Sequence, residues 1–159
     1  METWSTFYLA SAGAAAALAG LVVVAISVNV QSILSHPALP PRTAATIAAL
    51  IVALSCSLVG LIPQTQTAWS TEVLALGLVG WLIQTWVIFL LARTWRMRPW
   101  PEAAAALALS QLIGAPIPVG GALTLLAAAA GPDLIAAGVV LIFAGAVLNS
   151  WVLLVEILR

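Results

Sequence analysis

Long apolar stretches alternate with short polar segments along almost the whole chain. A helix that crosses the hydrocarbon core of a membrane needs about 20 mostly apolar residues. Stretches of this length occur five times, and charged residues lie only at their edges. The pattern predicts membrane-spanning helices over residues 7–30, 44–62, 73–92, 103–130 and 134–155. We therefore expect an all-α fold in which residues 1–159 form a single transmembrane domain, an integral membrane bundle of five helices.

The fourth stretch differs from the others in its length and in its centre. As one straight helix, residues 103–130 would run about 42 Å, at about 1.5 Å per residue, against a hydrocarbon core of about 30 Å. Proline has no N–H to donate to the preceding turn and disfavours the helical conformation in the residue before it. The residues that disrupt the helix are Gly114, Pro116, Pro118, Gly120 and Gly121. They predict a helix that is broken or strongly kinked near Pro116–Gly121, close to the middle of the bilayer.

This break has two interpretations, and the segment has a rival topology. Transporters use breaks in the middle of the membrane to hold a substrate or an ion, and the freed backbone groups then line a wet cavity. A plain proline kink that fits the helix to its neighbours needs no cavity. In the rival topology the segment is a re-entrant hairpin with two halves too short to span, which would invert the last helix and place Arg159 on the opposite side.

The basic residues are distributed asymmetrically between the two sides of the membrane. With five crossing helices, every arginine falls on the side of the C-terminus, and the chain has no lysine: Arg42, Arg93, Arg96, Arg98 and Arg159. Basic residues mark the cytoplasmic side. We therefore expect a multi-pass protein with its N-terminus outside and its C-terminus in the cytoplasm.

Small residues recur at helical spacing on three of the predicted helices. Membrane helices pack through small residues, because these allow the backbones to approach closely. One stripe contains Gly13, Gly20, Ser27 and Gln31; a second contains Gly138, Gly145, Asn149 and Glu156; a third contains Gly77, Gly80 and Gln84. The first and last helices run in the same direction, so we expect their stripes to face each other. So many small faces also predict a homo-oligomer.

Neutral polar side chains gather between the middle of the membrane and the expected cytoplasmic side. They predict either a polar vestibule that ends at the broken helix, or interhelical hydrogen bonds worth about 0.6 kcal/mol each. The candidate residues are Ser27, Asn29, Gln31, Gln84, Ser110, Gln111 and Asn149, with Glu156 at the mouth. Glu156 also has a plainer interpretation, as an interfacial carboxylate that pairs with an arginine such as Arg159, Arg42 or Arg93.

Composition narrows the chemistry by exclusion. Apolar types make up 64% of the chain and charged types 6%, against about 45–50% and about 25% in a soluble domain. The net charge of zero gives no reason to expect nucleic acid as a partner. Cys56 is the only cysteine and His36 the only histidine, so no metal site, cofactor site or catalytic base is expected. An enzyme is therefore the least expected class.

Two segments carry a resemblance to a family of small uncharacterised bacterial membrane proteins. These segments are the Gly/Ala-rich first helix, from Phe7 to Asn29, and the C-terminal run from Gly145 to Arg159. The resemblance implies a location in the bacterial cytoplasmic (inner) membrane. It carries over no functional residue and no cofactor.

Two functions fit these patterns. The first is a passive channel or uniporter with a polar vestibule that faces the cytoplasm. The alternative is a structural or regulatory subunit that packs against another membrane protein. A channel predicts a water-accessible track to residues 114–121, whereas a structural subunit predicts a closed, dry bundle. In either case the lipid bilayer is a partner, together with a second copy or another membrane protein.

Overall fold

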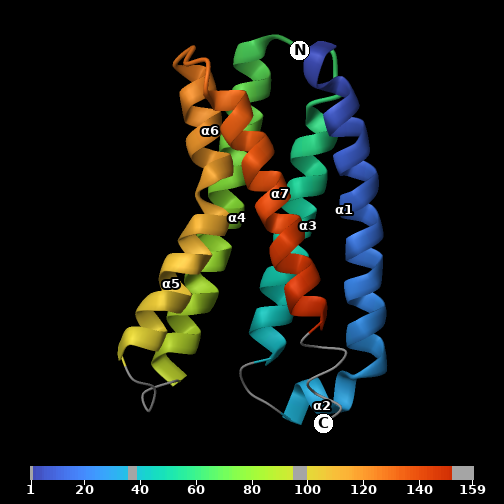
Figure 1. Ribbon diagram of the computed structural model, residues 1–159, viewed down its shortest axis with the longest axis vertical. Helices are drawn as coiled ribbons and strands as arrows, with labels where there is room; N and C mark the ends of the chain where they lie inside the picture. Colours follow the sequence, from blue (N-terminus) through green and yellow to red (C-terminus); the bar gives the residue numbers. More distant parts are fainter. Residues whose placement is uncertain (1, 36–38, 95–99, 152–159) are drawn as a thin grey trace.

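Every regular element of the computed structural model is helical within the part of the chain that it describes, residues 2–35, 39–94 and 100–151 (Figure 1). The helices of this part are α1 (Glu2–Val28), α2 (Val30–Ser35), α3 (Leu39–Val59), α4 (Gln66–Thr94), α5 (Trp100–Gly114), α6 (Pro116–Leu125) and α7 (Gly131–Trp151). The predicted all-α fold is confirmed.

Within the described ranges, five helical segments are long and apolar enough to cross a membrane, with mean hydropathies between 1.4 and 2.3. They are Trp4–Val28, Leu39–Val59, Gln66–Leu91, Leu107–Leu125 and Gly131–Trp151. The fourth segment joins α5 and α6, which follow one another in the same direction along the bundle (Figure 1). They therefore do not form the two antiparallel halves of a re-entrant hairpin. In agreement with five crossings, α1 begins at one end of the bundle and α7 finishes at the other.

Several helices begin earlier than the hydropathy pattern predicts. The second spanning helix starts at Leu39, because Pro40 and Pro41 fall in its first turn, where the backbone N–H has no helical partner to lose. The third starts at Gln66, where the hydroxyl of Thr65 accepts a hydrogen bond from the Ala68 N–H at 3.2 Å. Prolines and polar residues occupy these helix starts, so a prediction based on apolar runs places the starts too late in the sequence.

Asn29 interrupts the first helix, which was predicted to continue to residue 30. Its side-chain amide donates to the backbone carbonyl of Ala25 at 3.2 Å, and α2 follows as a short, separate helix at the end of the bundle (Figure 1). Asn29 is buried. One predicted pathway residue thus bonds within its own helix and marks the end of α1.

The fourth spanning helix ends at Leu125 rather than at residue 130, through a turn that the sequence did not reveal. Ala127 takes a left-handed conformation with φ of 58°. The N–H of Ala127 donates to the Thr124 carbonyl at 3.0 Å, and the N–H of Ala128 donates to the Leu123 carbonyl at 2.9 Å. This pair of bonds is the Schellman motif, in which glycine usually occupies the left-handed position.

The helices pack in a bundle with α6 between α4 and α7, and with α1 mainly against α3. A buried cluster that includes Val22, Leu50, Val73 and Val139 connects the long helices. Many large apolar side chains remain exposed on the outside of the bundle. An apolar exterior of this kind suits lipid, which agrees with the hydropathy of the five spans.

The predicted pairing of the first and last small-residue stripes is wrong. Gly13 and Gly20 are exposed, and a Cβ added at either position would meet no atom within 4 Å. The buried face of α1 instead carries Ala12, Ala15 and Val22. Gly138 of α7 packs on α6, because a Cβ there would lie 3.1 Å from the Ile117 backbone N. Helical spacing identified the stripes but could not show which neighbour each one meets.

Candidate functional site

The fourth spanning helix bends by 39° at Ala115, where α5 meets α6. The backbone of Ala115 stays helical, with φ of −73° and ψ of −29°. Its N–H donates to the Gln111 carbonyl at 2.9 Å, and its carbonyl accepts from the Val119 N–H at 3.1 Å. The predicted disruption is therefore a bend with helical backbone on both sides, and α5 and α6 are not separated by an unwound segment.

Two prolines explain why the bend lies at this point. Pro116 and Pro118 have no N–H, so the carbonyls of Leu112 and Gly114 lose their usual donors four residues later. The proline rings also crowd these carbonyls and push the preceding turn away. The bend changes the direction of α5, which packs mainly on α4, relative to α6, which packs on both α4 and α7.

Small residues hold the segment after the bend firmly against α4. A Cβ added at Gly77 would lie 2.8 Å from the backbone N of Pro118. A Cβ added at Gly121 would lie 2.9 Å from the Cα of Leu74. These separations are too short for any side chain, so the backbones of α4 and α6 touch. The predicted small face of α4 therefore packs on the proline segment.

The opposite side of α6 is packed equally closely against α7. A Cβ at Gly120 would lie 2.8 Å from the carbonyl oxygen of Gly131, and Gly138 lies against Ile117. Ile117 is only 1% exposed, and Thr124 is 2% exposed. Pro118, Gly120 and Gly121 are buried as well. The segment at which the predicted vestibule would end is thus enclosed between two helices.

Before the bend, α4 and α5 are joined by side-chain hydrogen bonds that we call the amide clasp. The Gln84 amide N–H donates to both the backbone oxygen and the hydroxyl of Ser110, each at 3.0 Å. The Gln111 amide N–H donates to the Thr85 hydroxyl at 3.3 Å, and its oxygen accepts from the Trp81 indole N–H. Three predicted pathway residues, Gln84, Ser110 and Gln111, therefore meet in this contact.

Sequence reasoning missed two members of the amide clasp, Trp81 and Thr85. Neither is among the candidates named from the sequence, because a tryptophan or threonine inside a span carries no sign of its partner. Trp81, Gln84 and Thr85 nevertheless occupy positions i, i+3 and i+4, which share one face of a helix. That spacing was the available signal.

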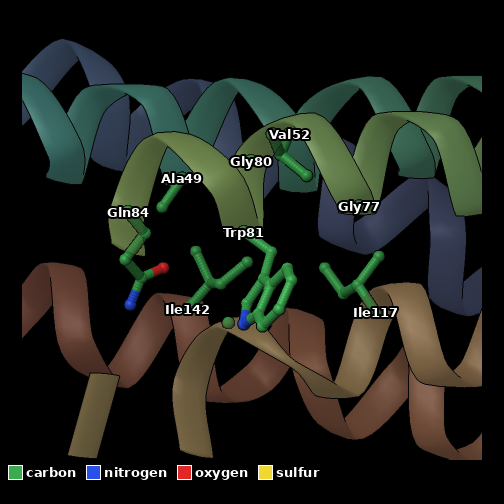
Figure 2. A pocket seen from close by; sticks show the side chains of 9 residues that line it. Ala49, Val52, Gly77, Gly80, Trp81, Gln84, Ile117 and Ile142 are labelled. Atoms are coloured by element: carbon green, nitrogen blue, oxygen red, sulfur yellow. The ribbon is translucent and has the colours of Figure 1, made fainter. Parts of the chain in front are cut away.

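A small pocket lies where the amide clasp meets the bend (Figure 2). Its volume is about 10 Å³, about the size needed for one water molecule. The side chains of Gln84 and Trp81 form part of its wall together with Gly114, and apolar residues of α3 and α7 complete it. The pocket is too small for a solute larger than water.

The remaining predicted pathway residues lie elsewhere. Asn149 of α7 donates from its side-chain amide to the Thr46 hydroxyl of α3 at 3.0 Å. Ser27 is exposed and donates to the Val23 carbonyl at 2.8 Å, and Gln31 is exposed as well. Glu156 and its suggested partner Arg159 lie outside the described residues. The candidate polar residues that the structure describes are therefore divided among several separate contacts.

No family model, curated protein or solved structure matches the chain. The five candidate spans of the described residues agree with a small protein that crosses the membrane several times. They do not assign it to a family.

Proposed function

We propose that the protein is a structural or regulatory membrane subunit that packs against another membrane protein through α1. One observation carries the proposal: among the described residues, no atom lies within 4 Å of a Cβ added at Gly13 or Gly20, so the face of α1 that bears these two glycines is uncovered. The passive channel or uniporter is the weaker candidate, because several of the polar side chains that suggested a pathway bond to neighbouring helices.

Four of the polar side chains that suggested a pathway, those of Gln84, Ser110, Gln111 and Asn149, form hydrogen bonds between neighbouring helices. Gln84 binds Ser110 between α4 and α5, whereas Asn149 binds Thr46 between α7 and α3. Interhelical hydrogen bonds of this kind stabilise membrane bundles without a role in transport. The close packing of α6 and the single-water size of the pocket also speak against a passage for solutes at the bend.

The uncovered face of α1 has the chemistry of a helix–helix interface. Gly13, Gly20 and Ser27 recur along it and are all exposed, and the exposed Gln31 follows in α2. In lipid, small residues permit a second helix to approach closely, and neutral polar side chains add hydrogen bonds between the helices. We call Gly13, Gly20 and Ser27 the open face of α1. It can take a helix of a different membrane protein or of a second copy of this chain.

The test is the mass of the complex purified in a mild detergent, measured by light scattering. We expect the wild-type protein to carry at least one additional chain. Gly13→Leu and Gly20→Leu should each release that chain, because a leucine prevents close approach but meets open space in the bundle itself. Ala137→Leu places the same side chain on an exposed position of α7 and serves as the matched control.

Mass spectrometry of the additional chain distinguishes a second copy from another protein. A wild-type protein that is a monomer without a partner would contradict the proposal. The same conclusion follows if both glycine variants keep the additional chain as firmly as Ala137→Leu does.

A further inference from the structure

Two hydrogen-bond donors are buried without an acceptor at the end of the bundle where α1 and α4 begin (Figure 1). They are the hydroxyl of Tyr8 and the indole N–H of Trp69. The two side chains are 1% and 2% exposed. Within the part of the chain that the structure describes, neither donor has a hydrogen-bond partner, although the side chains come from different helices and belong to one buried cluster.

The surroundings of these donors are aromatic and tightly packed. The rings of Tyr8 and Trp69 have centroids 6.0 Å apart, and Trp4 and Phe7 extend the group along α1. We call these four residues the aromatic cluster. Gly60, just after α3, lies against the Tyr8 ring so closely that a Cβ there would sit 2.7 Å from Cδ2. Such a site offers the donors apolar neighbours in place of an acceptor.

A dry, unpaired O–H or N–H group is less stable than the same group in contact with water. Acceptors are close by, because both side chains lie near the ends of their helices. Trp69 is three residues from the start of α4, about 4.5 Å along the helix axis, and Tyr8 is six residues from the start of α1, about 9 Å. At this depth the headgroup region supplies water and lipid oxygens, and it favours tyrosine and tryptophan.

We infer that this end of the bundle has a second, open conformation in which the first two turns of α1 move away from α4. In that conformation the Tyr8 hydroxyl and the Trp69 N–H donate to water or lipid oxygens at the membrane surface. The described conformation is the closed one. Aromatic packing favours the closed conformation, whereas the two unpaired donors favour the open one.

Cys56 is a built-in reporter of this opening. It is the only cysteine of the chain, is fully buried, and belongs to the same cluster as Tyr8 and Trp69. A thiol reacts as its thiolate, which requires contact with water. The rate at which a charged thiol reagent modifies Cys56 therefore reports the population of the open conformation. The measurement uses the full chain in lipid nanodiscs, where both membrane faces meet the reagent.

Tyr8→Phe is the decisive variant, because it keeps the ring and removes only the unpaired hydroxyl. The closed conformation then becomes more stable relative to the open one, and its population rises. We expect modification of Cys56 to slow by at least about fivefold. Gly60→Ala should have the opposite effect, since its Cβ would displace the Tyr8 ring. Trp86→Phe, at an exposed tryptophan of α4 outside the aromatic cluster, is the matched control and should leave the rate unchanged.

Two results would overturn the inference. If Tyr8→Phe is modified as fast as the wild-type protein or faster, the hydroxyl has a partner and does not favour opening. If Cys56 of the wild-type protein reacts only at temperatures where the whole bundle unfolds, measured in parallel by circular dichroism, no separate open conformation exists. Modification well below the unfolding temperature, slowed by Tyr8→Phe, supports it.

Discussion

At the scale of single residues, glycines have two opposite roles in this bundle. Gly77 and Gly121 allow the backbones of α4 and α6 to touch, since any side chain at either position would strike its neighbour. Gly13 and Gly20 have open space around them, so the fold of the single chain makes no use of their small size. The sequence shows both kinds in the same small-residue stripes, and only the packing distinguishes them.

This difference predicts opposite outcomes for the same substitution at two glycines. Gly121→Ala should lower the free energy of unfolding by about 1–3 kcal/mol, because the added Cβ would lie 2.9 Å from the backbone of Leu74 and α4 would have to shift. Gly20→Ala should cause no loss, because nothing lies within 4 Å. Thermal unfolding in mild detergent measures both. Equal destabilisation of the two variants would show that the packing of α4 on α6 is described incorrectly.

Ala127 offers a second test at the residue scale. Its φ of 58° is a left-handed conformation that disfavours residues with a Cβ, and the Schellman bonds around it fix the end of α6. Ala127→Gly should therefore stabilise the protein by about 0.5–1 kcal/mol, visible as a higher unfolding temperature. A lower unfolding temperature for this variant would argue against the left-handed turn. The turn escaped sequence analysis because an alanine occupies the position where glycine is usual.

At the scale of elements, the sequence predicts where the fourth spanning helix is disrupted but not the geometry of the disruption. Its two prolines predicted a disruption near the middle of the bilayer, and a 39° bend is found at Ala115. The nature of the disruption was not predictable from the prolines alone. It depends on α4 and α7, whose small residues surround the segment and keep α6 helical. Between α4 and α7, the proline segment is therefore a bent helix and not an unwound one.

Replacing both prolines tests the origin of this bend. Pro116→Ala together with Pro118→Ala restores the N–H donors for the carbonyls of Leu112 and Gly114. The angle between α5 and α6 should then fall below 39°. Spin labels at the exposed positions Leu109 and Leu125 would report this as a longer distance across the bend. An unchanged distance would mean that packing on α4, and not the prolines, sets the angle.

At the scale of the whole molecule, the number of membrane crossings followed from hydropathy and length, while the contacts did not. Five apolar stretches of sufficient length predicted five spans, and the described residues contain five candidate spans. The depth of Gln84, Gln111 and Asn149 suggested one vestibule, because depth along a helix is readable from sequence. The direction in which each side chain points around its helix axis, toward one neighbouring helix or another, cannot be read from the sequence in the same way. That direction places Gln84 and Gln111 in the amide clasp between α4 and α5, and Asn149 in a different contact between α7 and α3.

The central claim is that the polar side chains inside the bundle join helices and do not line a water-filled passage. Its most direct test is the rate at which a charged thiol reagent modifies Gln111→Cys and Asn149→Cys in a Cys56→Ala background in lipid nanodiscs. Leu50→Cys, at a fully buried position, and Thr67→Cys, at an exposed position near the start of α4, provide the slow and fast references. We predict that both test cysteines react as slowly as the one at position 50. Rates close to that at position 67 would contradict the account and restore the channel as the first candidate.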